Sequence, residues 1–466
     1  MAITVNNINA MQLLHILNRT SEAQNTTFTQ MSTGSRINRG KDDPAGLIAM
    51  RGLETELRAV EASISNNERT DAMLNVADKA LGEVASLINE IKELAIASAN
   101  EDGISASELA ANQSQVDEAL KAIDQIISTT QFNGKKLLDG SLGIQVSGVD
   151  SADITDLRVY SRTDSDVAIT VELQQSASQA VVSIASTSAT DDTAINIQGK
   201  DGAVVIEIAS GENLSAVAAK INAATAQTGV VASASAGDLS LISSDYGSDA
   251  FVRVTVVDTD TSDTSFTAQS DTGSDAQIDI NGQAAAVDGK TVSYSANGVS
   301  FTFNITDAFN QSAVGTTTTF TVESEGGATF QLGTTNQTRQ TIGIDGLYTH
   351  LLGDASLGYL QSLGGGKAHS LLNDPNTAAR IASAAAAQVA TVQGRIGGFQ
   401  KFQVQTALSQ QTATKESYTA ALSTIRDVDY ATATADMNRQ NVLMQSAMAL
   451  LGLANQQTMQ VLTLLR

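Results

Sequence analysis

The sequence predicts an α+β protein in which long, coiled-coil-like helices from the paired N- and C-terminal regions flank a mostly β central insertion of one or two domains. Three observations predict this class. Apolar residues recur at helical spacing near both ends, short alternating runs fill the middle, and only two prolines interrupt the 466 residues. Long helices tolerate few prolines, so this scarcity suits extended helical segments.

Composition excludes several classes of function. The net charge is −23, and residues 141–345 alone carry 25 acidic and 7 basic residues, a net charge of −18. An acidic surface repels nucleic acid and anionic lipid, so neither is an expected partner. The absence of Cys removes disulfides and thiolate metal sites. No apolar run reaches the roughly 18 residues that a membrane span needs.

The first predicted helix covers residues 1–36. Its apolar positions recur at helical spacing and are Ile8, Met11, Leu14, Leu17, Phe28 and Met31. The residues between them are polar but mostly uncharged, such as Asn18 and Ser21. A stripe of this kind does not support a monomeric fold by itself, so we expect the helix to need a partner.

A break and a long helix follow. The break reads RINRGKDDPAG (36–46), in which Asp43 suits the N-cap and Pro44 the first helical position. The pattern then predicts a helix over 44–99, a rod roughly 80 Å long at 1.5 Å per residue. Its second half has a coiled-coil seam at Leu74, Ala77, Leu81, Val84, Ile88, Ile91 and Ala95. A second helix is expected at about 105–129, and Asn-Gly at 133–134 marks a turn.

The middle of the chain changes character. Short alternating runs indicate strands, and they read AVVIEI (203–208), LSLI (239–242), VRVTVV (252–257) and VSFTFNI (299–305). One helix-like insert, at 214–225, interrupts them. The helical pattern returns from Asp374–Pro375, and a last apolar run from about Asp436 to Arg466 places Met437, Met444 and Leu451 seven residues apart. A helix this apolar needs to be buried.

Each end therefore exposes an apolar stripe that its own segment cannot cover. Packing N-terminal helices against C-terminal helices solves this and leaves the β middle as an insertion. The terminal helices, about 1–36 and 430–466, would still show apolar faces after pairing. Two solutions remain open on periodicity alone: a closed intramolecular bundle, or a helical polymer of many copies.

These residues resemble the bacterial flagellins. The resemblance is carried at the N-terminal side by MSTGSRINRGKDDPAGL (31–47), INEIKELAIASAN (88–100) and TTQFNGKKLL (129–138). At the C-terminal side it is carried by IRDVDYATATADMNRQNVLMQSAMALLGLANQQTMQVLTLLR (425–466). It covers about 1–140 and 374–466, in the same order and at both ends. Residues 193–257 also resemble, more weakly, a β-rich module of flagellins and hook-associated proteins.

The resemblance implies three regions. Residues 1–42 with 428–466 correspond to inner filament-core helices, 43–140 with 374–427 to an outer helical shell, and 141–373 to a variable, mostly β, surface-exposed part. The residues that correspond to the joint between the two helical layers are Arg36, Asn38, Asp42, Asp43, Arg426, Asp427, Asp429 and Tyr430. Those of the core helices are Leu14, Leu17, Met444, Leu451, Leu462, Leu464, Leu465 and Arg466. Asp43 has the simpler interpretation of an N-cap alone.

The implied function is a structural subunit that self-assembles into the extracellular flagellar filament used for motility. The implied partners are further copies of the chain and flagellar cap, junction and export proteins. The N-terminus lacks a signal-peptide pattern, which agrees with export without a cleaved signal peptide. Two alternatives are a hook–filament junction protein and a secreted adhesin with a helical stalk.

Innate receptors recognise some flagellins through the outer shell, and the corresponding stretch here contains Glu93 and Leu94. Glu90 stands where recognised flagellins have an arginine, and Gln115 where they have an acid. Charge reversal at an interface opposes binding, so receptor binding is expected to be weak.

No chemistry beyond assembly is indicated. The three histidines, His15, His350 and His369, form no HExxH motif. The run DTDTSD (258–263) lacks the Gly and final Glu of a calcium loop, so a solvated turn is the main interpretation and weak calcium binding the alternative. We expect no catalytic residues, cofactor or metal, and hence no enzyme.

Overall fold

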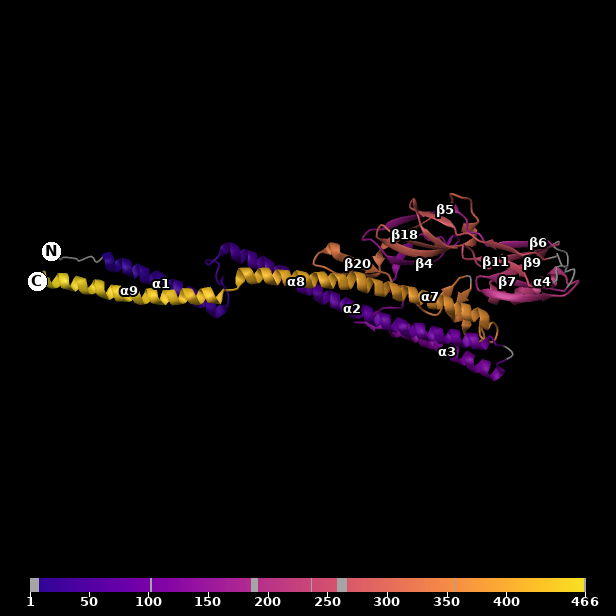
Figure 1. Cartoon of the computed structure of the whole chain (residues 1–466), viewed down its shortest axis with the longest axis horizontal. Coiled ribbons are helices and arrows are strands. Elements are labelled where there is room, and N and C mark those ends of the chain that lie inside the picture. The colour runs from indigo at the N-terminus through magenta and orange to yellow at the C-terminus, as the bar shows by residue number, and fades with distance from the viewer. Residues whose placement is uncertain are drawn as a thin grey trace. The chain divides into compact units, whose positions relative to one another are not determined.

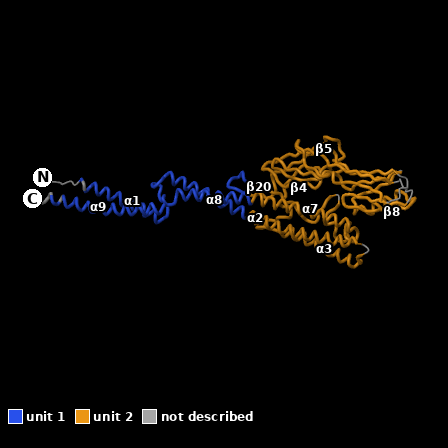
Figure 2. Tube along the Cα trace, in the orientation of Figure 1, with its two compact units in different colours: residues 1–68, 331–338, 405–466 blue, residues 69–330, 339–404 orange. Residues whose placement is uncertain are grey.

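The computed structural model describes residues 8–100, 103–185, 192–235, 237–257, 266–355 and 357–464. The chain forms two compact units, shown in different colours in Figure 2. Unit 1 consists of Met1–Glu68, Gln331–Thr338 and Gln405–Arg466, and unit 2 of Arg69–Phe330 and Arg339–Val404. Helix α2 (Pro44–Ser98) contributes its first half to unit 1 and its second half to unit 2.

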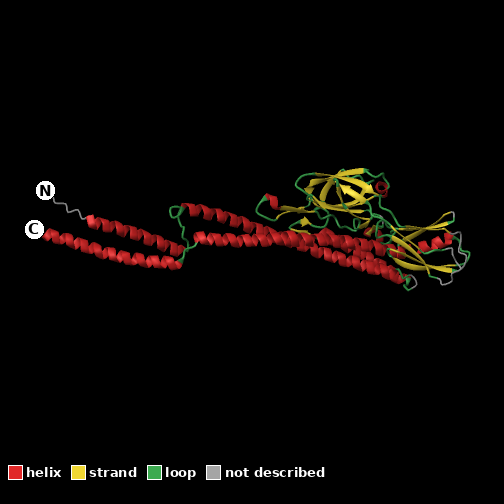
Figure 3. Ribbon diagram, turned by 45° about the horizontal axis from the view of Figure 1, so that its top comes forward, coloured by secondary structure: helices red, strands yellow, loops and turns green. Residues whose placement is uncertain are grey.

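Unit 1 is helical. Helices α1 (Ile8–Thr33) and α9 (Tyr430–Leu464) lie side by side and run in opposite directions (Figures 1 and 3). The first half of α2 is joined to α8 (Gln405–Arg426) by an ion pair between Lys415 Nζ and Glu61 Oε1, 3.1 Å apart. The loop 331–338, with the 3₁₀ turn η1 (Asn336–Thr338), is held on α2 because the buried side chains of Ser63 and Asn67 both donate to the Leu332 carbonyl.

The helices of unit 2 form a three-helix bundle of α2 from Arg69 onward, α3 (Ala106–Thr129) and α7 (Pro375–Phe399). Every residue of the predicted α2 seam from Leu74 to Ala95 is at most 1% exposed. α3 starts at a capping box of Ser105 and Glu108, and α7 at the Asp374 N-cap with Pro375 in the first turn. A π-helical turn, η3 (Gln400–Val404), follows α7.

Short elements connect the bundle to the β part. Strands β1 (Gln131–Phe132) and β2 (Lys135–Lys136) form a hairpin whose turn residues Asn133 and Gly134 both have positive φ, as the Asn-Gly signal predicts. Further along, β19 (Ala328–Gln331) pairs with β20 (Arg339–Ile342), and β21 (Gly353–Asp354) with β22 (Gly358–Tyr359). The 3₁₀ turn η2 (Leu360–Leu363) follows β22.

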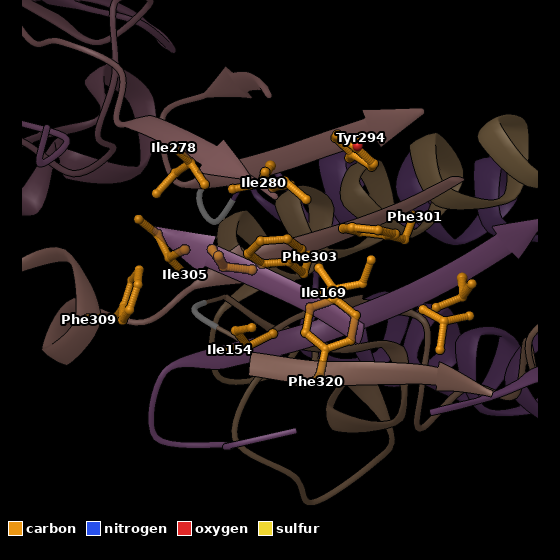
Figure 4. Close-up of a cluster of buried hydrophobic side chains, with 14 of the residues drawn as sticks. Ile154, Ile169, Ile278, Ile280, Tyr294, Phe301, Phe303, Ile305, Phe309 and Phe320 are labelled. Atoms are coloured by element: carbon orange, nitrogen blue, oxygen red, sulfur yellow. The ribbon is translucent and has the colours of Figure 1, made fainter. Parts of the chain in front are cut away.

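The first β domain of unit 2 has two antiparallel sheets around one core. The five-stranded sheet has the order β14-β13-β5-β18-β3 and the four-stranded sheet the order β15-β16-β17-β4. Phe301 and Phe303 meet Phe320 edge-on in this core, with the Phe301 and Phe320 ring centroids 5.4 Å apart (Figure 4). Their elements are β3 (Ile144–Ser147), β4 (Ile154–Ser161), β5 (Val167–Gln175), β13 (Gln277–Ile280), β14 (Gln283–Ala284), β15 (Ala286–Asp288), β16 (Thr291–Ala296), β17 (Val299–Ile305), β18 (Thr317–Gly326) and the short helix α6 (Asp307–Asn310).

The second β domain of unit 2 has its own core. A three-stranded sheet, β6-β10-β9, and a four-stranded sheet, β12-β11-β7-β8, bury Ile195, Ile197, Leu239 and Leu241 together with Val217 of α4. Its elements are β6 (Val181–Ala185), β7 (Thr193–Gly199), β8 (Gly202–Ile208), α4 (Leu214–Ala223), α5 (Thr225–Thr228), β9 (Val230–Ser235), β10 (Asp238–Ser243), β11 (Phe251–Val256) and β12 (Gln269–Thr272). The β middle expected from the sequence thus has two hydrophobic cores, and the predicted strands and helical insert are present in it.

Candidate functional site

The joint, which we define as residues 34–46 with 422–432, is held by a short backbone ladder. The Arg36 amide donates to the Arg426 carbonyl at 2.6 Å, and the Val428 amide donates to the Gly34 carbonyl at 3.1 Å. Ser35 and Asp427 form the antiparallel bridge between these two bonds. The ends of α1 and α8 are therefore fastened through main-chain groups, which no single side chain in the sequence reveals.

Two predicted joint residues add side-chain bonds across the same contact. Arg36 Nη2 donates to the Ile425 carbonyl at 3.0 Å, and the Tyr430 hydroxyl donates to the Met31 carbonyl at 3.1 Å. Gly34 ends α1 with φ of +71°, and a Cβ there would lie 3.3 Å from the Tyr430 hydroxyl oxygen. A glycine at this position permits both the left-handed turn and the close approach of Tyr430.

The predicted residues Asn38, Asp42 and Asp43 shape the turn that leads into α2. Asp42 Oδ2 accepts from the amides of Asn38 and Arg39 at 3.1 and 2.8 Å. Asn38 Nδ2 donates to the Ser35 carbonyl at 2.8 Å. Asp43 Oδ1 accepts from the Gly46 amide at 2.8 Å, so Asp43 caps α2 directly before Pro44. The structure thus shows Asp43 as the N-cap of α2.

The acids on the other side of the joint act locally in the same way. Asp427 accepts from Ser423 Oγ and from Arg426 Nε, and these bonds lower the pKa of its carboxyl. Asp429 accepts from Thr432 Oγ1 and from the amides of Ala431 and Thr432, and these bonds lower the pKa of its carboxyl as well. Asp429 therefore caps α9, which begins at Tyr430, as expected for the last helix.

The α1–α9 pair has a seam with heptad spacing on both helices. On α1 the seam residues are Ala10, Leu13, Leu17, Thr20, Gln24, Thr27 and Met31, and on α9 they are Ala433, Met437, Gln440, Met444, Ala447, Leu451 and Ala454. The intervals alternate between three and four residues, as in a coiled coil. Leu17, Met444 and Leu451, which were predicted core-helix residues, are partly buried in this seam.

The expected apolar stripe of α1 mostly faces away from α9, which corrects our assumption that this stripe drives the pairing. Ile8, Met11, Leu14 and Phe28 are 64%, 54%, 44% and 63% exposed. The seam instead contains hydrogen-bonded polar residues: Gln24 Nε2 donates to Asn441 Oδ1, and Gln440 Nε2 donates to Thr27 Oγ1 at 3.3 Å. The faces that meet are thus joined partly by polar pairs, while most of the most apolar stripe stays exposed.

The outer surface of the pair is strongly apolar. On α9 the exposed large apolar residues are Val442, Leu443, Met448, Leu450, Leu453 and Met459, each more than half exposed. A groove of about 330 Å³ lies between the helices, lined by Gln12, Leu13, Ile16, Leu450, Leu453, Ala454 and Gln457. Of the other predicted core-helix residues, Leu462 and Leu464 belong to the last turn of α9, and Leu465 and Arg466 lie outside the described residues. The pair thus exposes apolar surface that a soluble monomer does not need.

The stretch that corresponds to the receptor-facing surface lies on unit 2. Glu90 and Glu93 are exposed on α2, Leu94 is partly buried beside them, and Gln115 is exposed on α3. The two glutamates therefore stand free at the bundle surface, where a charge reversal would act directly on an approaching protein.

A groove of about 440 Å³ lies between α7 and the four-stranded sheet of the first β domain, with Arg158, Tyr160, Gln388 and Arg395 in its lining. The Arg395 guanidinium carbon lies 3.3 Å from the centre of the Tyr160 ring. Burial raises the pKa of Asp345 to about 6, and the nearby Arg158 and Arg395 offset part of that rise. This cluster lies between strand and helix, and sequence reasoning missed it because Asp345 carries no motif.

No group of three or more His, Cys, Asp or Glu side chains suited to a metal occurs within the described ranges. The DTDTSD run (258–263) lies outside those ranges. Among the helices that the structure describes, none is long and apolar enough to cross a membrane.

Comparison with known families matches three segments of the chain. Residues 5–143 match the bacterial flagellin N-terminal helical region, 379–465 the bacterial flagellin C-terminal helical region, and 194–245 the flagellin hook IN motif. The chain belongs to the bacterial flagellin family. The flagellin matches cover α1, α2, α3, most of α7, and α8 and α9, and the IN motif covers most of the second β domain from β7 to β10. The predicted resemblance and its weaker central segment are confirmed.

Individual relatives support the same family. Flagellin E of Vibrio cholerae is 36% identical over 141 residues, which are 30% of this chain and 37% of that protein. The chain thus matches less than half the length of this relative. A flagellin of Salmonella rubislaw is 27% identical over 99% of both chains. Among solved structures, FlgL of Xanthomonas campestris is 12% identical over 80% of this chain and 99% of that chain, with a TM-score of 0.29, too low to support an argument about the fold.

Proposed function

We propose that this flagellin is the bulk structural subunit of an extracellular flagellar filament used for motility, and that its role is structural rather than catalytic. The observation that carries the proposal is the outer surface of the α1–α9 pair. Large apolar residues remain exposed on both helices after the pair has formed, and association of further copies would bury them. Contacts between different faces of identical copies propagate into a helical polymer unless they close a ring.

The bulk-subunit proposal is favoured over a hook–filament junction protein or a secreted adhesin by sequence similarity along the whole chain. The flagellin of Salmonella rubislaw aligns over 99% of both chains. Within the proposal, the predicted joint residues, such as Arg36 and Tyr430, hold each subunit's own helices in place. The outward residues of α1 and α9 contact neighbouring copies. Cap, junction and export proteins of the flagellum are the other proposed partners.

Electron microscopy of purified protein after seeding or addition of ammonium sulfate tests the proposal. Such a salt strengthens apolar burial, so the full chain is expected to form filaments and a variant truncated before Asp436 to form none. Leu453→Glu should also abolish filaments, because it places a charge on the outward face of α9. The matched control Gln445→Glu, at another exposed position of the same helix, should leave assembly intact. A full-length chain that stays monomeric under all these conditions would contradict the proposal.

A further inference from the structure

Helix α9 carries large apolar residues opposite the seam as well as in it. Met444 and Leu451 lie in the seam, whereas Val442 and Leu453 are 62% and 53% exposed. Each of these outward residues stands two positions from a seam residue, which is a rotation of about 200° around an α-helix. A half-turn of α9 about its axis would therefore bring Val442 and Leu453 to α1, together with Arg439, Ser446 and Gln456.

The two faces differ in their polar residues. Gln24, Thr27, Gln440 and Asn441 form what we call the polar layer, in which Gln24 donates to Asn441 and Gln440 donates to Thr27. The Thr27 hydroxyl donates to the Ala23 carbonyl at 3.0 Å, so its oxygen is left to accept from Gln440. Thr27 is only 8% exposed. Rotating α9 would break both of these hydrogen bonds between the helices and leave the buried Thr27 hydroxyl with only its bond to Ala23.

We propose that the polar layer fixes the rotation of α9 about its own axis and thereby selects the apolar face that the subunit presents to neighbouring copies. Gln440 and Asn441 are positioning residues in this scheme. The inference rests on the proposed filament function, because only an assembling subunit needs one particular face outward.

The layer carries a stability cost that fits such a role. Gln440 Oε1 is buried and has no hydrogen-bond partner within the part of the chain that the structure describes. Polar residues at core positions of coiled coils typically exchange stability for a unique arrangement. An apolar pair of the same shape would bury more surface and leave no orphaned acceptor. The polar layer is therefore poorly suited to stabilising the α1–α9 pair and well suited to specifying one arrangement of the two helices.

The absence of cysteine from the chain permits a direct test by disulfide trapping. One reporter carries Leu13→Cys with Ala454→Cys, two positions that line the same groove. The matched reporter carries Leu13→Cys with Gln456→Cys, which is two residues further along α9 and about 200° around it. Each reporter is built in the full-length chain with the native layer, and in a variant with Gln24→Leu, Thr27→Val, Gln440→Leu and Asn441→Leu. Both are oxidised in ammonium sulfate.

With the native layer, the 13–454 disulfide should predominate. In the layer variant, the yield ratio of 13–454 to 13–456 should fall roughly tenfold, the change that about one net hydrogen bond makes in an equilibrium. An unchanged ratio would overturn the proposal, as would equal yields, or no disulfide, with the native layer. Tyr430→Phe removes the bond to Met31 at the joint, and it should leave the ratio unchanged if the layer rather than the joint sets the rotation.

Electron microscopy of the same samples separates this inference from the proposed function. If the chain forms polymers but the ratio of 13–454 to 13–456 disulfides is the same with and without the polar layer, the inference is refuted and the filament function stands. A layer-dependent ratio in a chain that forms no polymer would support the rotation and refute the filament function.

Discussion

The amide of Arg36 donates a hydrogen bond to the carbonyl of Arg426 at 2.6 Å, joining residues from nearly opposite ends of the sequence. With the Ser35–Asp427 bridge, this bond forms a main-chain contact between the segment after α1 and the segment before α9. The chain's two ends are thus joined by main-chain bonds at the joint as well as by the seam between α1 and α9. The joint is accordingly a point where small changes are expected to have measurable effects.

Gly34→Ala is expected to weaken the joint. Gly34 has φ of +71°, and its new Cβ would lie 3.3 Å from the Tyr430 hydroxyl, so the substitution should cost roughly 1 kcal/mol. The measurement is the rate of limited proteolysis between residues 30 and 46, which should rise. Gly52→Ala is the control: its Cβ meets nothing within 4 Å inside α2, so it should stabilise the helix by roughly 0.5–1 kcal/mol. Equal protease rates for Gly34→Ala and the native chain would contradict the role of Gly34.

Leu81→Ala is expected to destabilise the three-helix bundle of unit 2. Leu81 is fully buried in the seam of α2, and truncating a core leucine costs about 2–5 kcal/mol through lost burial and the remaining cavity. Denaturant titration followed by circular dichroism should show an earlier loss of helix. Ile96→Ala removes apolar atoms from the same helix at a position that is 55% exposed, and should change the midpoint little. Similar shifts for both variants would argue against the observed seam.

Asp345→Asn is expected to stabilise unit 2 at neutral pH. Burial raises the pKa of Asp345 from 3.8 to about 6, so the folded state holds this proton more tightly than the unfolded state. Stability should fall as pH rises from about 4 to 6, and the full cost, about 3 kcal/mol at 1.36 kcal/mol per pKa unit, should be present above pH 6.

The Asp345→Asn variant removes this cost. In urea titrations its free energy of unfolding should therefore exceed that of the native chain clearly at pH 7.5 and equal it near pH 3.5. Asp249→Asn, at an exposed loop position, should show no such pH-dependent gain. A gain of the same size at both pH values would instead point to a change in packing.

Glu90→Arg is expected to increase activation of an innate flagellin receptor by the purified monomer. Glu90 is exposed on α2, where recognised flagellins have an arginine, and a like or reversed charge at an interface can change affinity by several kcal/mol. A cell reporter assay should give a weak response to the native chain and a stronger one to Glu90→Arg, with a further gain from Gln115→Glu. The control Glu83→Arg reverses an exposed charge on α2 outside the receptor-facing stretch and should leave the response low. A full response to the native monomer would refute the proposed weak recognition.

Much of the fold follows from local sequence signals. Asp43 and Pro44 mark the start of α2, the seam from Leu74 to Ala95 is buried as its spacing indicates, and Asn133–Gly134 forms the predicted turn. These features are predictable because caps, turns and single buried stripes depend on residues within a few positions of one another. The uncovered apolar stripes of both ends gave the expectation that they pair, and the family resemblance added the expectation of a helical polymer.

The tertiary structure decided what local signals leave open. Leu14 and Leu17 look equivalent in the sequence, yet Leu17 lies in the α1–α9 seam and Leu14 is 44% exposed. The β middle separates into two cores because its strands pair with distant partners, such as β5 with β18, which alternation does not specify. Asp345 acquires its raised pKa only from surroundings built by remote segments. Periodicity determines that a face is apolar, whereas the partners that meet across it, such as Gln440 and Thr27, are brought together only by folding.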